Sequence, residues 1–170
     1  MSKVCEYFFA PQSPWTYLGH QRFVDLAKQY EVKIELKPCD LGRVFATSGG
    51  LPLAKRAPQR QAYRLVEMQR WSEHLGLPMH LQPTFFPVAA DPAALLIIAA
   101  QLANGTDAAV NLTGAILRGV WAEQKNIADA DTLAGTVPVR FHLPGTSRKS
   151  IFGMQSKAQT TEIRQYCEDL

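Results

Sequence analysis

Phe8-Phe9-Ala10-Pro11-Gln12-Ser13-Pro14-Trp15-Thr16-Tyr17-Leu18 is the stretch that decides the fold of this 170-residue chain. The alternating run before it, Lys3–Phe9, predicts a buried strand, and the amphipathic run after it predicts a helix over Pro14–Tyr30. Ser13 stands at the N-cap position of that helix, and Pro14 at its first helical position. Because unpaired backbone N–H groups and the positive end of the helix dipole meet there, the turn favours an anion. We interpret that anion as the sulfur of a bound thiol.

A second strand completes a βαβ unit. Apolar Val32, Ile34 and Leu36 alternate with charged residues over Val32–Pro38, which is typical of a half-buried strand. A strand, a helix and a strand of these lengths predict a parallel pair joined by a right-handed crossover.

The centre of the chain is predicted to be helical. Residues 39–58 read as irregular, with a turn at Ser48–Pro52, and residues 77–87 as an extended loop. Helices are expected over Gln59–Leu75, ended by Gly76; over Asp91–Ala103, with Asp91 as N-cap and Pro92 first in the helix; over Thr106–Glu123; and over Asp129–Val137. The fold class is therefore α/β, a βαβ unit (1–40) with an all-helical insertion (41–134) and a tail (135–170).

Composition excludes several classes of protein. The net charge is +3 with no block of Lys or Arg, so nucleic-acid binding is not expected. The longest apolar stretch, Pro92–Ala103, is too short to span a bilayer, and no secretory signal precedes the first strand. The cysteines Cys5, Cys39 and Cys167 are scattered, which argues against a disulfide framework or a zinc site and predicts core packing for Cys5. A reduced, cytoplasmic protein is expected.

Several motifs follow one another in order over residues 3–134: Phe8–Leu18, Asp40–Val44, Gln69–Trp71, Leu75–Pro78 and Trp121–Glu123. This ordered set resembles the 2-hydroxychromene-2-carboxylate isomerase family, DsbA-like proteins close to kappa-class glutathione transferases. The resemblance implies a thioredoxin fold interrupted by a helical domain. It also implies glutathione as cofactor, with a serine at the start of the first helix beside the glutathione sulfur. Ser13 matches that serine.

The resemblance implies a reaction as well. The ring of 2-hydroxychromene-2-carboxylate opens, and the open form is isomerised from cis to trans. Glutathione thiolate adding transiently to the conjugated alkene would leave a single bond that can rotate. The Ser13 hydroxyl, donating to the sulfur at a helix N-terminus, would hold it anionic. Disulfide oxidoreductases of the superfamily carry Cys-Pro-x-Cys at this turn; Ser13 and Thr16 stand in the two cysteine positions, which removes dithiol exchange.

The candidate site residues are Ser13 for catalysis, Ser13, Pro14 and Trp15 for glutathione, and Tyr17, Lys55, Arg56, Arg60 and Trp71 for the substrate. The three basic residues either meet the substrate carboxylate or form a solvated helix start. Tyr17 and Trp71 either line the pocket or pack in the core. Trp121 is expected to pack, and His20 to be exposed on the first helix.

The tail fits the family in two ways. In one, residues 136–138 are the cis-proline loop that clamps glutathione, a hairpin runs to Gly153, and Lys157–Leu170 is the last helix. In the other, which we favour, residues 135–170 correspond to helices preceding that loop, and the C-terminal ββα part is missing. The alternatives to an isomerase are a kappa-like glutathione transferase and a truncated, non-catalytic relative. The expected partner is a small aromatic carboxylate, and because relatives are often dimers, a homodimer is also expected.

Overall fold

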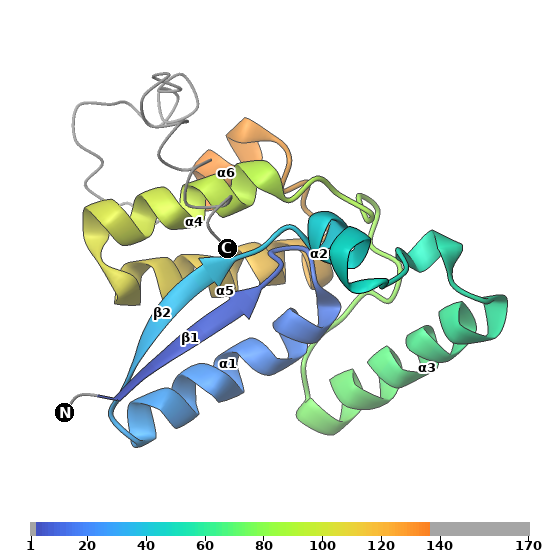
Figure 1. Ribbon diagram of the computed structural model, residues 1–170, viewed down its shortest axis with the longest axis horizontal. Helices are drawn as coiled ribbons and strands as arrows, with labels where there is room; N and C mark the ends of the chain where they lie inside the picture. The colour runs from blue at the N-terminus through green and yellow to red at the C-terminus, as the bar shows by residue number, and fades with distance from the viewer. Residues whose placement is uncertain (1–2, 137–170) are drawn as a thin grey trace.

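The computed structural model describes residues 3–136, and both interpretations of the tail lie outside them. The elements in order are β1 (Lys3–Phe9), α1 (Pro14–Gln29), β2 (Val32–Pro38), α2 (Leu41–Ser48), the 3₁₀ turn η1 (Leu53–Lys55), α3 (Pro58–Leu75), α4 (Asp91–Asn104), α5 (Thr106–Trp121) and α6 (Ala130–Thr136). The α/β class and the helical insertion after a βαβ unit are confirmed (Figure 1). The division into segments 1–40, 41–134 and 135–170 stays a prediction.

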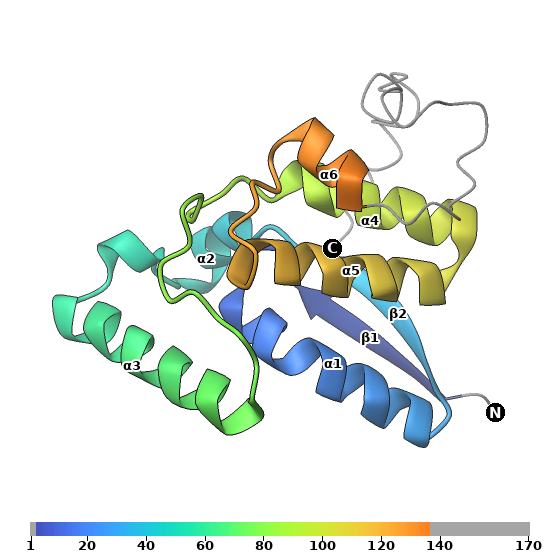
Figure 2. The ribbon, with the colours of Figure 1, turned by 180° about the vertical axis from the view of Figure 1, so that it is seen from behind.

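The two strands pair in parallel, with Lys3 opposite Val32 and Phe9 opposite Pro38. Helices α1 and α5 pack against each other and against the sheet, as the view from behind shows (Figure 2). The prediction of a buried first strand is wrong for one of its two faces. Val4 and Phe8 are 54% and 53% exposed, because no described helix covers the face that carries them. Period-two alternation of burial therefore holds along β1. In β2 it holds as far as Leu36, after which Lys37 and Pro38 are buried as well.

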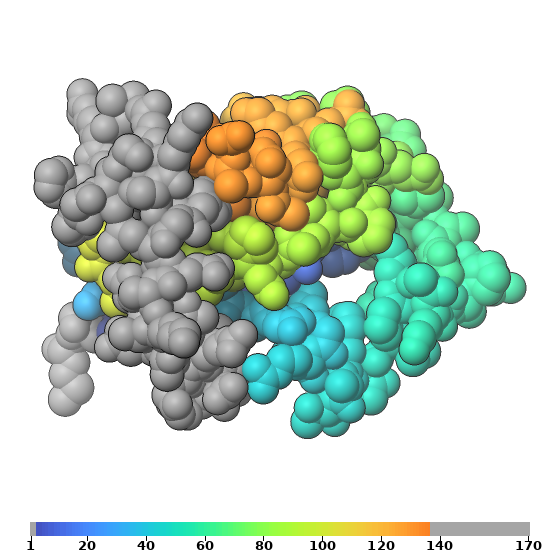
Figure 3. Space-filling model, turned by 90° about the horizontal axis from the view of Figure 1, so that it is seen from above, coloured from blue at the N-terminus to red at the C-terminus, as the bar shows by residue number. Residues whose placement is uncertain are grey.

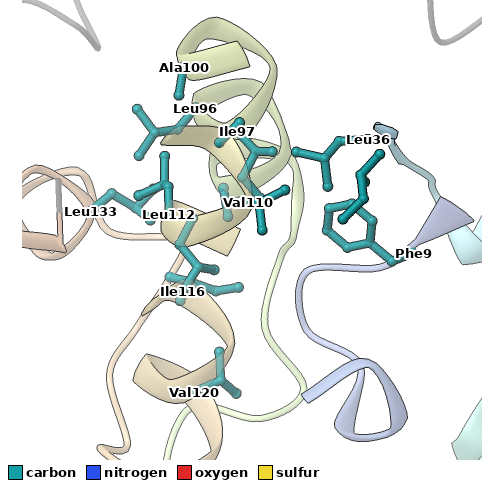
Figure 4. Packing of buried hydrophobic residues seen from close by; sticks show 14 of the residues in the cluster. Phe9, Leu36, Leu96, Ile97, Ala100, Val110, Leu112, Ile116, Val120 and Leu133 are labelled. Atoms are coloured by element: carbon teal, nitrogen blue, oxygen red, sulfur yellow. The ribbon is translucent and has the colours of Figure 1, made fainter. Parts of the chain in front are cut away.

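The hydrophobic core lies between the sheet and the helices of the insertion (Figure 4). Phe9 and Leu36 enter it from the strands, and the remaining large side chains come mainly from α4 and α5. Trp121, at the end of α5, is fully buried, which confirms its predicted packing role. Cys5 is only partly buried, so its predicted place in the core is not borne out.

The prediction that residues 39–58 are irregular is wrong for Leu41–Ser48, which form α2. The Asp40 carboxylate accepts hydrogen bonds from the backbone N–H groups of Gly42 and Arg43, at 2.7 and 3.4 Å, and so caps the helix. Gly49 ends it in the left-handed conformation, with φ 74°. The prediction of Asp91 as the N-cap of α4 is wrong. The helix starts after Ala90, and Asp91 lies within its first turn.

His20 is buried, which contradicts its predicted exposure. Its Nε2 lies 3.1 Å from the carbonyl oxygen of Val110, and its Nδ1 lies 3.3 Å from the Tyr7 hydroxyl. Because a carbonyl can only accept, Nε2 carries the hydrogen and Nδ1 accepts from Tyr7. Burial lowers the pKa of His20 and raises the pKa of Tyr7 to about 12. The neutral ring thus joins β1, α1 and α5.

Helix α3 extends to one side of the sheet and packs on α1 (Figure 1). Seen from above, the surface is hollowed where the α2–α3 region stands away from the rest of the described chain (Figure 3). Over residues 3–136, no helix combines the length and the apolar character needed to cross a membrane.

Candidate functional site

The predicted N-cap at the start of α1 is confirmed. Ser13 has extended backbone angles, and its Oγ accepts a hydrogen bond from the backbone N–H of Thr16 at 3.3 Å. Pro14 follows at the first helical position and is buried. No acidic residue lies in the first turn, so the positive end of the helix dipole is not neutralised there.

Two hydrogen-bond donors of this turn are free. Within residues 3–136, neither the Ser13 hydroxyl hydrogen nor the backbone N–H of Trp15 has an acceptor. The Thr16 N–H occupies a lone pair of Ser13 Oγ and leaves the hydroxyl hydrogen to point elsewhere. The turn can therefore offer two donors to one anionic atom outside the protein.

A buried acceptor lies in the same turn. The Oε1 atom of Gln12 is shielded from solvent and has no donor among the described residues. A buried acceptor without a donor is costly, and because this atom is closed off from solvent, it is closed off from a ligand in this conformation as well. The thiolate of glutathione fits the free donors at Ser13 and Trp15.

A cleft of about 270 Å³ opens beside this turn. Its lining comes from the first turn of α1, from the residue after η1 and from α3: Trp15, Arg56, Arg60, Tyr63, Arg64, Glu67 and Trp71. The cleft thus brings together four of the predicted site residues: Trp15, Arg56, Arg60 and Trp71. Its lining holds three arginines and one carboxylate, that of Glu67. The volume lies just below the range typical of ligand pockets, roughly 300–1,000 Å³, and suits one small molecule.

The other two predicted substrate residues do not line this cleft. Tyr17 donates its hydroxyl to the carbonyl oxygen of Pro78 at 2.6 Å, which ties α1 to the loop after α3. Burial raises the pKa of Tyr17, so this hydroxyl stays protonated. Lys55 is exposed at the end of η1. Contacts of Tyr17 and Lys55 with a substrate stay predictions.

Sequence reasoning missed Arg64. This side chain is partly buried, and its guanidinium carbon lies 5.4 Å from the ring centre of Phe86 and 5.9 Å from that of Trp121. Burial lowers the pKa of Arg64, and the charge of Arg56 lowers it further. The signal would have been its position one turn after Arg60, on the same face of α3.

Among the described residues, no three or more His, Cys, Asp or Glu side chains gather into a metal site. Cys39, which follows β2, donates its thiol to the carbonyl oxygen of Phe9 at 3.4 Å. Burial and the neighbouring Asp40 charge raise the pKa of that thiol. Cys39 is therefore a poor nucleophile.

The fold and the turn together define a thioredoxin-like protein without the redox cysteines. The DSBA-like thioredoxin domain family matches residues 4–138, and the chain belongs to that family.

Within the family, the chain is a distant relative of 2-hydroxychromene-2-carboxylate isomerases. It is 31% identical to the enzyme of Pseudomonas putida over 77 residues, 45% of this chain and 38% of that enzyme. It is 24% identical to the enzyme of Sphingobium xenophagum over 136 residues, 79% of this chain and 67% of that enzyme. The Pseudomonas putida match thus spans little more than a third of that relative.

The fold is shared with solved structures of related proteins, among them the following two. A 2-hydroxychromene-2-carboxylate isomerase superposes with a TM-score of 0.70 at 22% identity, covering 98% of this chain and 78% of that one. The cytosolic disulfide reductase DsbM from Pseudomonas aeruginosa, solved with GSH, gives 0.66 at 15% identity, covering 98% and 76%. The predicted resemblance is confirmed, and the identities are too low to transfer an activity.

Proposed function

We propose that this protein is a glutathione-dependent cis–trans isomerase of aromatic carboxylates similar to 2-hydroxychromene-2-carboxylate. One observation carries the proposal. A helix N-terminus with a free serine hydroxyl stands beside a cleft lined by arginines and aromatic rings, and Trp15 belongs to both. The first feature suits a thiolate and the second suits an aromatic anion.

Glutathione, when bound, would supply a thiolate nucleophile able to add reversibly to a conjugated double bond. The protein has to keep that sulfur anionic near neutral pH. The Ser13 hydroxyl and the Trp15 N–H can donate to it, and the α1 dipole adds a favourable potential. The Thr16 N–H orients the Ser13 hydroxyl by occupying its Oγ lone pair.

The cleft supplies the substrate contacts in this proposal. The indole rings of Trp15 and Trp71, 42% and 43% exposed, can pack against an aromatic ring. The arginines can bind its carboxylate with paired N–H donors. A carboxylate-bearing substrate fits these charges better than a neutral electrophile does, which favours an isomerase over a kappa-like transferase.

The test is turnover of 2-hydroxychromene-2-carboxylate by the purified chain with and without glutathione. Glutathione-stimulated isomerisation is expected for the natural protein and should be lost in Ser13→Ala. Ser48→Ala, at an exposed serine ending α2, is the matched control and should keep it. Absence of glutathione-stimulated turnover in the natural protein would refute the proposal. Conjugation of 1-chloro-2,4-dinitrobenzene without isomerisation would also refute it, in favour of a transferase.

A further inference from the structure

We propose that Arg64 binds the carboxylate of the ligand in the cleft, and that Arg56 and Arg60 form a cationic entrance to it. The inference takes its substrate class, an aromatic carboxylate, from the proposed function. It assigns the specificity for the anion to a side chain that the sequence patterns did not single out.

Among the described residues, the charge of Arg64 has no anionic partner. A partly buried guanidinium loses hydration, and proteins normally offset that loss with an anionic partner. Within residues 3–136, Arg64 forms no ion pair and donates no hydrogen bond; the ion pairs there belong to Lys37 and Lys125. Glu67 lines the same cleft yet lies beyond ion-pair distance of Arg64. The N–H donors of Arg64 are therefore available to a ligand.

The Arg64 guanidinium is also held in place by two aromatic rings before any ligand binds. Phe86 and the fully buried Trp121 hold the Arg64 guanidinium by cation–π contacts, and their rings pack 4.9 Å apart. Such contacts use the charge of the group and consume none of its five N–H donors. A guanidinium already held in place loses little conformational entropy when it binds a carboxylate through two parallel hydrogen bonds.

Arg56 and Arg60 are less suited to that task. Arg56 already donates its Nε hydrogen to the carbonyl oxygen of Leu51 at 2.8 Å, and its guanidinium lies 5.8 Å from the Phe45 ring centre. Arg60 is exposed, so solvent and salt screen its charge. Both charges raise the local concentration of an anion without fixing its orientation. Burial, and after it the charge of Arg56, lowers the pKa of Arg64, and a bound anion would offset both effects.

The test compares binding of trans-cinnamate with that of its neutral analogue cinnamamide, by calorimetry, without glutathione and at low salt. The natural protein should prefer the carboxylate by about tenfold or more, the strength of a charged hydrogen-bond pair. Arg64→Gln should abolish the preference, and Arg64→Lys should keep only part of it because lysine lacks the planar fork. Glu67→Gln should tighten cinnamate binding alone, because it removes a negative charge from the cleft.

Two controls keep the result interpretable. Arg70→Gln makes the same charge change on α3 outside the cleft lining and should leave both affinities unchanged. Cinnamamide should bind every variant equally, which shows that the cleft is folded. Arg60→Gln should reduce cinnamate affinity by less than about threefold, as expected of an exposed pair.

The proposal is overturned if the natural protein shows no preference for cinnamate, or if Arg64→Gln keeps that preference. A larger loss in Arg60→Gln than in Arg64→Gln would overturn it too. The proposed isomerase activity fails separately: intact, Arg64-dependent cinnamate binding without glutathione-stimulated turnover would refute only the activity.

Discussion

Replacing Ser13 with alanine removes two interactions of different kinds. One is the cap on α1, because Ser13 Oγ accepts from the Thr16 N–H at 3.3 Å. Losing such a cap costs about 1 kcal/mol of the free energy of unfolding. The other is the proposed donor to the glutathione sulfur. A hydrogen bond to a charged group contributes about 1.5–3 kcal/mol. One pKa unit corresponds to about 1.36 kcal/mol, so losing this hydrogen bond should raise the pKa of the bound glutathione thiol by roughly one to two pKa units.

The assay is a pH titration of the bound thiolate, followed by its ultraviolet absorbance, in the natural protein and in Ser13→Ala. Ser13→Thr, which restores both the hydroxyl and the cap, should return the pKa of the glutathione thiol towards the natural value. Asp129→Ala is the matched control for stability alone. Asp129 accepts from the Thr132 N–H at 2.8 Å before α6, so its loss should lower the melting temperature without changing that pKa.

One result would refute the reasoning. If Ser13→Ala lowers the free energy of unfolding by about the cap contribution yet leaves the pKa of the glutathione thiol unchanged, Ser13 is a helix cap and nothing more. The backbone N–H of Trp15 and the dipole of α1 would then be the whole electrostatic contribution of the turn.

Three further predictions concern the fold. Burial lowers the pKa of His20 below 6.5, so below about pH 6.5 the folded state binds fewer protons than the unfolded state. The free energy of unfolding should therefore fall as the pH drops through that range. His20→Asn should flatten this pH dependence, as measured by urea unfolding. Trp121→Ala should cost about 3–5 kcal/mol in the same experiment, because the indole is fully buried. Gly76, with φ 63°, ends α3 in the left-handed region, so Gly76→Ala should destabilise by about 1 kcal/mol, while Gly135→Ala, in an open position of α6, should stabilise slightly.

The local features of this fold were predictable from the sequence. Ser13 and Pro14 mark the start of α1, Gly76 marks the end of α3, and alternation sets the buried face of β2. The two helix ends depend on contacts between residues at most four apart, and the alternation of β2 is visible along the strand itself, so a short stretch of sequence predicts each feature. The start and end of α2 were equally local, in Asp40 and Gly49. The glycine- and proline-rich turn that follows α2 indicates irregular structure, and this signal obscured the two helix ends.

The charged part of the cleft was decided by tertiary structure. Arg64 stands between Tyr63 and Leu65 in the sequence, and only its contacts with the Phe86 and Trp121 rings set its environment. His20 is likewise buried by a contact with Val110, ninety residues away. Helical spacing shows which face of a helix is apolar, and it does not show which distant element will cover a polar residue. The sequence by itself therefore determined the capped turn at Ser13, whereas only the folded chain decided which arginine beside that turn has no acidic partner within residues 3–136.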